Sequence, residues 1–111
     1  MDLYQELQTK IKLLDKSIDK LKENGTAYAE AEKTYKIALM KEVLRLRDEG
    51  VAVGVIDKIC YGIPSVAELR FKRDVAKTVY QANQEAINTY KLEIRIIQNQ
   101  IDKEYGREEI S

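Results

Sequence analysis

The sequence predicts an all-α protein built as a long, coiled-coil-like antiparallel helical hairpin with a short apolar helix at the bend. Three observations support this fold class. The composition combines 34% charged residues with only five glycines and one proline, which is typical of long helices with solvated faces. Apolar residues recur with heptad spacing along two long stretches. A short apolar segment separates these stretches, and the 111 residues fit a single domain over 1–111.

The first long helix is predicted over residues 3–48. Its seam consists of two interleaved heptad series, which contain Leu7, Leu14, Leu21, Tyr28 and Tyr35, and Ile11, Ile18, Leu39 and Leu46. Asp2 is suited to the N-cap, where its carboxylate can accept a hydrogen bond from the first turn. Asn24-Gly25-Thr26 is typical of a turn, but the seam keeps its phase across Gly25. We therefore expect an unbroken helix, since one internal glycine costs only about 1 kcal/mol.

A short helix is predicted over residues 54–61. Gly50 should end the preceding helix by adopting a left-handed conformation. Residues 51–63 contain seven large apolar side chains among thirteen residues, which makes this segment too apolar for a free loop. Gly62 is expected to end the short helix.

The second long helix is predicted over residues 66–105. Ser65-Val66-Ala67-Glu68 has the pattern of a capping box, with Pro64 just before it. The seam of this helix contains Leu69, Arg73, Ala76, Tyr80, Asn83, Ile87, Tyr90, Ile94, Ile97 and Ile101. The polar tail, residues 106–111, is expected to fray.

The two helices are similar in length, so we expect them to lie antiparallel along their seams. The predicted register pairs Leu46 with Leu69 and Tyr28 with Ile87. It also places Gly25 opposite Tyr90, so that a residue without a side chain faces a large ring.

Polar seam residues meet one another in the same register. Glu42 faces Arg73 and Glu32 faces Asn83, and buried polar layers of this kind can fix the alignment of two helices. Alternatively, Glu42 and Arg73 simply extend to solvent.

A two-helix hairpin of this size buries little apolar surface, so we expect it to dimerise into a four-helix bundle. A second stripe on the later helix supports this expectation; it contains Val75, Val79, Ala82 and Ala86. Three alanines on the first helix would allow close approach: Ala27, Ala29 and Ala31. The same alanines are equally explained by their high helix propensity.

Residue types that many active sites require are missing. The chain has no histidine and a single cysteine, Cys60, which excludes imidazole catalysis, His-ligated zinc and an internal disulfide. No two acidic residues are spaced i,i+3, and no Gly-rich phosphate loop is present. We therefore expect no enzyme, no metal and no cofactor.

A lone cysteine, the absence of a signal-peptide pattern and the lack of long apolar stretches predict a cytoplasmic protein without a membrane segment.

Basic residues gather near the predicted bend. Residues 36–77 contain nine Lys and Arg against six Asp and Glu. The predicted partner contacts are Arg45, Arg47, Ile56, Lys58, Ile59, Tyr61, Arg70 and Lys72, with the two isoleucines as apolar anchors. A basic rim around apolar residues suits an acidic protein partner or, alternatively, the phosphate backbone of a nucleic acid. Another interpretation is that these cations form local ion pairs around an apolar plug.

Three stretches resemble a family of small helical proteins encoded by Gram-positive bacteriophages and prophages. They are Ala-Glu-Ala-Glu-Lys-Thr-Tyr-Lys-Ile-Ala-Leu at 29–39, Val-Ala-Glu-Leu-Arg-Phe-Lys-Arg-Asp-Val-Ala at 66–76 and Asn-Gln-Glu-Ala-Ile-Asn at 83–88. The likeness consists of helix-seam patterns and carries over no functional residue. It implies a phage or prophage origin, the cytoplasm of a bacterial host, and an accessory or host-directed binding role. Together with the missing catalytic motifs, this predicts a non-enzymatic accessory protein that binds another protein. The alternative function is a nucleic-acid-binding factor of phage replication or recombination.

Overall fold

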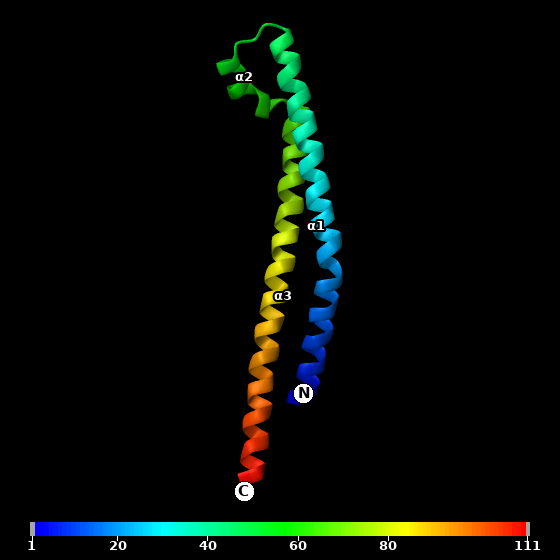
Figure 1. The fold of residues 1–111 in the computed structure, drawn as a ribbon, viewed down its shortest axis with the longest axis vertical. Helices are drawn as coiled ribbons and strands as arrows, with labels where there is room; N and C mark the ends of the chain where they lie inside the picture. Colours follow the sequence, from blue (N-terminus) through cyan, green and yellow to red (C-terminus); the bar gives the residue numbers. More distant parts are fainter. Residues whose placement is uncertain (1, 111) are drawn as a thin grey trace. The chain divides into compact units, whose positions relative to one another are not determined.

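The computed structural model describes the backbone of residues 2–110 and the side chains of residues 2–106. Helix α1 covers Leu3–Asp48, α2 covers Val53–Ile59, the 3-10 helix η1 covers Cys60–Gly62, and α3 covers Pro64–Ile110 (Figure 1). No strand occurs in residues 2–110. Helix α1 packs against α3, which confirms the predicted all-α hairpin.

Contacts between residues divide the hairpin into two units, each of which contains part of both long helices. The terminal unit consists of residues 1–23 and 81–111, and the bend unit consists of residues 24–80. The bend unit therefore includes the end of α1, all of α2 and η1, and the start of α3. A single domain over residues 1–111 stays a prediction.

Helix α1 begins with the predicted N-cap and continues through Gly25. The Gln5 amide donates a 2.8 Å hydrogen bond to Asp2 Oδ1, which satisfies one of the free amides of the first turn. The helix is unbroken over Leu3–Asp48, as the phase of the seam predicts. A Cβ at Gly25 would lie 3.2 Å from Cε2 of Tyr80, so the missing side chain allows the tyrosine ring to pack against the α1 backbone.

The end of α1 is built around Gly50, which has a φ of 84°. The Val51 amide donates to the Leu46 carbonyl and the Gly50 amide donates to the Arg47 carbonyl, both at 3.0 Å. This pair of hydrogen bonds is a Schellman motif, in which the left-handed residue is usually glycine. The predicted role of Gly50 is confirmed, and the motif turns the chain toward α2.

Helix α2 and η1 fold back onto the last turns of α1. Ile56, Cys60 and Leu46 form a buried cluster, and four partly buried residues pack against it: Leu39, Val43, Val51 and Ile63. Figure 1 shows α2 beside the C-terminal part of α1. The predicted short helix at 54–61 is therefore present as α2 with η1, and its inward face is apolar because it closes the bend unit.

Helix α3 begins two residues earlier than expected. The Ala67 amide donates to the Ile63 carbonyl at 2.8 Å, and Ile63 has an extended backbone, so Ile63 is the N-cap and Pro64 the first helical residue. The prediction of Ser65 as the cap was wrong, because proline has a φ suited to the first helical position and no N–H to leave unsatisfied. The helix also continues past residue 105 to Ile110, through part of the predicted frayed tail; Ser111 lies outside the described residues.

The seam faces agree closely with the predicted ones. All ten predicted seam residues of α3 are buried or half-buried. On α1 the same is true of the predicted seam except Ile18, which is exposed. Heptad spacing therefore identified the inward face of each long helix.

The register between the helices differs from the predicted one. Gly25 faces Tyr80 rather than Tyr90, a difference of ten residues or about three turns of α3. The rings of Tyr28 and Tyr80 lie 6.1 Å apart between centroids, so the predicted pairing of Tyr28 with Ile87 is also wrong.

The short helix explains this shift. Leu46 was expected to face Leu69, but Ile56 and Cys60 cover it instead. They occupy the space beside the last turns of α1 that the first turns of α3 were expected to fill. Seam residues of a heptad pattern recur every three or four residues, so a shift of ten residues (one heptad plus a three-residue step) again places seam residues opposite one another. Seam patterns alone therefore do not distinguish these registers.

The terminal unit has its own antiparallel contacts. The Lys10 ammonium pairs with the Glu93 carboxylate and lies 5.9 Å from the centroid of the Tyr90 ring. Asn83 Nδ2 donates to the Ser17 carbonyl at 2.8 Å. Hydrogen bonding with Glu93 raises the pKa of Lys10, so the ammonium stays charged.

Candidate protein-interaction surface

The polar residues that were expected to set the register lie at the helix interface but have different partners. Arg73 Nη1 donates to Glu32 Oε1 at 3.2 Å, and its Nε donates to Asp74 Oδ1 at 2.7 Å. The predicted partner of Arg73, Glu42, instead accepts a hydrogen bond from Arg45 at 2.8 Å. The pairings of Glu42 with Arg73 and of Glu32 with Asn83 were therefore wrong, because they assumed the other register.

Arg73 also lies over the buried ring of Tyr35, with 4.8 Å between the guanidinium carbon and the ring centroid. Burial alone would raise the pKa of Glu32. The hydrogen bond with the Tyr28 hydroxyl and the positive charges of Lys36 and Arg73 have the larger, opposite effect, so the pKa of Glu32 is lowered. Burial, followed by the interaction with Glu32, raises the pKa of Tyr28. This polar cluster holds α1 and α3 together within the bend unit and has the character of a structural contact.

Two arginines near the bend form ion pairs within the chain: Arg45, a predicted partner contact, and Arg73, a predicted seam residue. Arg45 binds Glu42 and Glu49, each at 2.8 Å, and these hydrogen bonds raise its pKa. Arg73 is occupied by Glu32 and Asp74. For these two residues the local ion-pair interpretation is correct.

The other predicted cations point to solvent. Arg47, Lys58 and Lys72 are exposed, and among residues 2–106 no carboxylate oxygen lies within 4.0 Å of their charged nitrogens. Arg70 lies over the ring of Tyr61, 5.1 Å from its centroid. This cation–π contact joins the start of α3 to η1 and keeps the tyrosine ring at the surface.

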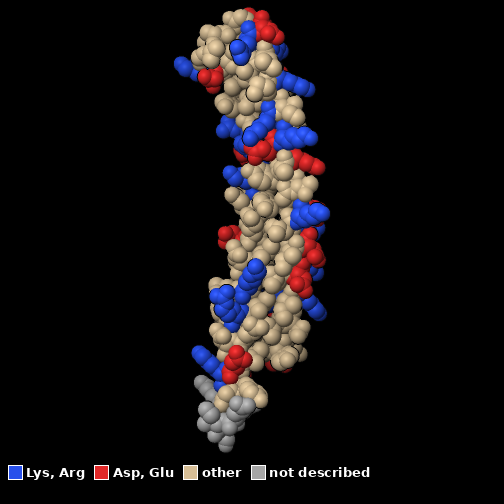
Figure 2. All heavy atoms as spheres, viewed as in Figure 1, with Lys and Arg blue, Asp and Glu red and all other residues tan. Residues whose placement is uncertain are grey.

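The exposed sides of α2 and η1 carry several large apolar side chains. We call this set, with Arg70, the α2 surface; its apolar members are Val53, Val55, Ile59 and Tyr61, each 43–65% exposed. Ile56, which was predicted as an apolar anchor for a partner, is only 2% exposed and packs against Leu46. That prediction was wrong, because Ile56 attaches α2 to α1. In the view of Figure 2, uncharged side chains cover much of the region that α2 occupies, with charged side chains at its margin.

Sequence reasoning missed Val53 and Val55 as surface residues. A helix of seven residues can bury only one narrow face, and Ile56 and Cys60 already occupy it at the i,i+4 spacing. The spacing gave no signal in the sequence, because the exposed pair Val55 and Ile59 is also spaced i,i+4. The interpretation of the segment as an apolar plug therefore explains its inner face and leaves its outer face unexplained.

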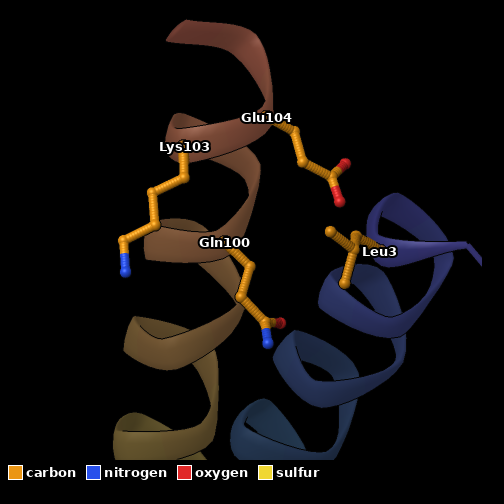
Figure 3. Close-up of a pocket in the computed structure, with 4 residues that line it drawn as sticks. All are labelled: Leu3, Gln100, Lys103 and Glu104. Atoms are coloured by element: carbon orange, nitrogen blue, oxygen red, sulfur yellow. The ribbon is translucent and has the colours of Figure 1, made fainter. Parts of the chain in front are cut away.

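A small pocket lies in the terminal unit between the start of α1 and the end of α3 (Figure 3). It has a volume of about 240 Å³ and is lined by Leu3, Gln100, Lys103 and Glu104. The Lys103 ammonium points away from Leu3 in Figure 3, so the charged groups do not converge on one ligand atom. Pockets that bind small molecules are more apolar and have convergent polar groups.

Within the part of the chain that the structure describes, no three Cys, Asp or Glu side chains come together in a way that could hold a metal ion. No helix in that part is long and apolar enough to span a membrane. Comparisons with protein-family models, with curated proteins and with solved structures find no match to this chain.

Proposed function

We propose that this chain is a non-enzymatic helical module that binds another protein through the α2 surface. The observation that carries this proposal is the exposure of four large apolar side chains on α2 and η1, which are held against α1 by the buried residues Ile56 and Cys60. Isolated apolar residues are common on protein surfaces, but neighbouring ones on a fixed element are typical of interaction sites.

The charges around this surface favour a partner that combines apolar and acidic side chains. Lys58 and Lys72 are exposed without carboxylate partners among residues 2–106. A complementary acidic rim on the partner would speed association and select the orientation of binding. Ile59 and Tyr61 would supply the apolar contact area, since buried aromatic and aliphatic anchors provide most of the binding free energy in such interfaces.

The resemblance to small helical proteins of Gram-positive phages and prophages supports a phage or prophage origin. On this basis we place the protein in the cytoplasm of a bacterial host as an accessory factor. The proposal is consistent with the lone cysteine, Cys60, which is buried and not in a disulfide.

We also propose that the chain forms a homodimer. Two exposed apolar stripes in the bend unit support this part of the proposal: one on α1 contains Ile37, Met40 and Leu44, and one on α3 contains Phe71, Val75 and Val79. A hairpin that leaves such stripes in water gains stability when a second copy covers one of them.

Capture from a bacterial host lysate tests the protein-binding proposal. The wild-type chain and an Ile59→Glu variant are immobilised side by side, with Leu92→Glu, an exposed residue of the terminal unit, as the matched control. We expect one or more proteins to be recovered by the wild type and the control and lost by Ile59→Glu, because a buried unpaired carboxylate disrupts an apolar contact. Equal recovery by all three, with unchanged circular dichroism, would show that the α2 surface is not the contact.

The exposed cations also favour a second candidate, a nucleic-acid-binding factor of phage replication or recombination. Phosphate contacts weaken steeply with salt, so retention on single- and double-stranded DNA should fall sharply between about 50 mM and about 200 mM salt if this function is correct. No retention at the lower salt concentration rejects it. Arg45 and Arg73 are paired with carboxylates and would add little to phosphate binding, so this function is the second candidate and protein binding the first.

A further inference from the structure

Helix α1 carries a second heptad series on the side away from its seam with α3. Its positions alternate by three and four residues; they are Glu30, Lys33, Ile37, Met40, Leu44 and Arg47. All six are exposed, and the three apolar ones are 47–58% exposed. The seam residues Glu32, Tyr35 and Leu39 are half-buried or buried, so this second series, which we call the outer stripe, lies on a different face of the helix.

The outer stripe is complementary to itself when two copies run antiparallel. With a two-fold axis between Ile37 and Met40, each of these residues faces the other on the second copy. Lys33 faces Leu44, whose side chain can pack along the aliphatic part of the lysine while the ammonium stays in water. Layers of this kind, with alternate heptad positions facing one another, are the packing pattern of an antiparallel coiled coil.

The ends of the outer stripe carry opposite charges. In the same arrangement Glu30 of one copy faces Arg47 of the other, and the two-fold axis repeats this pair at the opposite end. Neither residue has an oppositely charged group within 4.0 Å in the part of the chain that the structure describes. An isologous interface would therefore pair both charges and cover the apolar residues between them.

We infer that the outer stripe of α1 is the surface on which a second copy of this chain docks, antiparallel, with the two-fold axis between Ile37 and Met40. This inference rests on the proposed homodimer and assigns its interface. The α3 stripe of Phe71, Val75 and Val79 is the competing surface within the same unit. A two-fold axis at Val75 pairs its apolar residues but places Lys72 opposite Thr78, so it brings no opposite charges together.

Sedimentation velocity on charge-reversal variants tests the inference. Because the stripe is short, we expect the wild-type chain to be dimeric at about 200 µM and to dissociate on dilution toward about 5 µM, as mass action requires. Glu30→Arg and Arg47→Glu should each weaken the dimer at least about tenfold, through like-charge contacts at both ends. The double variant restores opposite charges and should return the dimer to within about threefold of the wild type. Asp19→Arg, at an exposed site of α1 in the terminal unit, is the control and should have no effect.

The outcomes separate the interface from the dimer itself. A wild-type chain that stays monomeric at about 200 µM overturns both the homodimer and this inference. A dimer that survives Met40→Glu but is lost in Val75→Glu overturns only the inference and assigns the interface to the α3 stripe. Failure of the double variant to recover, with helicity unchanged, also overturns it. Met40 and Val75 are both exposed, so neither variant should unfold the chain.

Discussion

At the residue scale, the structure depends on two glycines that serve different physical purposes. Gly25 lies inside α1 and allows Tyr80 to approach the backbone, whereas Gly50 has a positive φ and nothing within 4 Å of a built Cβ. Steric space limits substitution at Gly25, and backbone conformation limits it at Gly50.

Replacement of Gly50 by alanine measures the free-energy cost of a left-handed backbone conformation alone, because the site has room for a side chain. We expect Gly50→Ala to lower the free energy of unfolding by about 1–2 kcal/mol, the cost of a left-handed L-residue. Urea denaturation followed by circular dichroism measures the change. Gly54, in α2, has no positive φ and open space around it, so Gly54→Ala should be neutral or stabilising by up to about 1 kcal/mol. Equal losses for both variants would contradict this assignment.

Glu32 gives a pH dependence whose sign follows from its lowered pKa. A carboxylate with a lowered pKa in the folded state stabilises the chain at pH values above its ordinary pKa of 4.5. This stabilisation is lost as the pH falls through the folded-state pKa. Glu32→Gln should therefore melt at a lower temperature than the wild type near pH 7. The difference should shrink as the pH falls through the lowered pKa of Glu32, because the wild-type carboxyl then becomes neutral as well. Thermal melts across this range test the prediction, and a difference that grows on acidification contradicts it.

At the element scale, α2 decides how α1 and α3 align. The seams of both long helices were predictable from heptad spacing, because each side chain's direction follows from its place in the helix. The register was not, because several shifts bury the same seam residues and only the packing of Ile56 and Cys60 onto Leu46 separates them.

Truncation of Ile56 should therefore loosen the bend unit. Ile56→Ala is expected to cost about 2–5 kcal/mol, as is usual for a buried isoleucine, and hydrogen exchange should increase over α2 and the last turns of α1. Val53→Ala is the matched control, because Val53 is 65% exposed and its truncation should change stability by less than about 0.5 kcal/mol. Similar losses for the two variants would show that α2 is not held by Ile56.

A charge-reversal cycle tests the register itself. Arg73→Glu should lower the melting temperature by a few degrees, because it places a carboxylate beside Glu32 and Asp74. Glu32→Arg added to Arg73→Glu should recover part of that loss. The equivalent addition of Glu42→Arg should not, since Glu42 contacts Arg45 instead. Recovery by Glu42→Arg alone would favour the register expected from the seams.

At the scale of the whole molecule, stability should depend on concentration. If a second copy covers an apolar stripe, the melting temperature rises with protein concentration. We expect a rise of a few degrees between about 5 µM and about 200 µM for the wild type. We expect almost none for Leu44→Glu, which places a charge among the apolar residues of the outer stripe. Differential scanning fluorimetry measures both, and a concentration-independent wild-type melt contradicts the homodimer.

The candidate contact surface was only partly predictable. Ile59, Tyr61 and the exposed cations were predictable as candidate contacts, because the segment between the two long helices is rich in apolar and basic residues. Ile56 was misplaced because a short apolar helix has both a buried and an exposed face. Only the contact with α1 decides which is which.

The sequence by itself determined the helices, their inward faces, the N-cap at Asp2 and the left-handed turn at Gly50, because these depend on contacts within one or two turns. The tertiary structure decided the register, the partners of Glu32 and Arg73, and the side of α2 that faces water. These features depend on competition between residues far apart in the chain, and the buried packing of Ile56 and Cys60 resolves that competition.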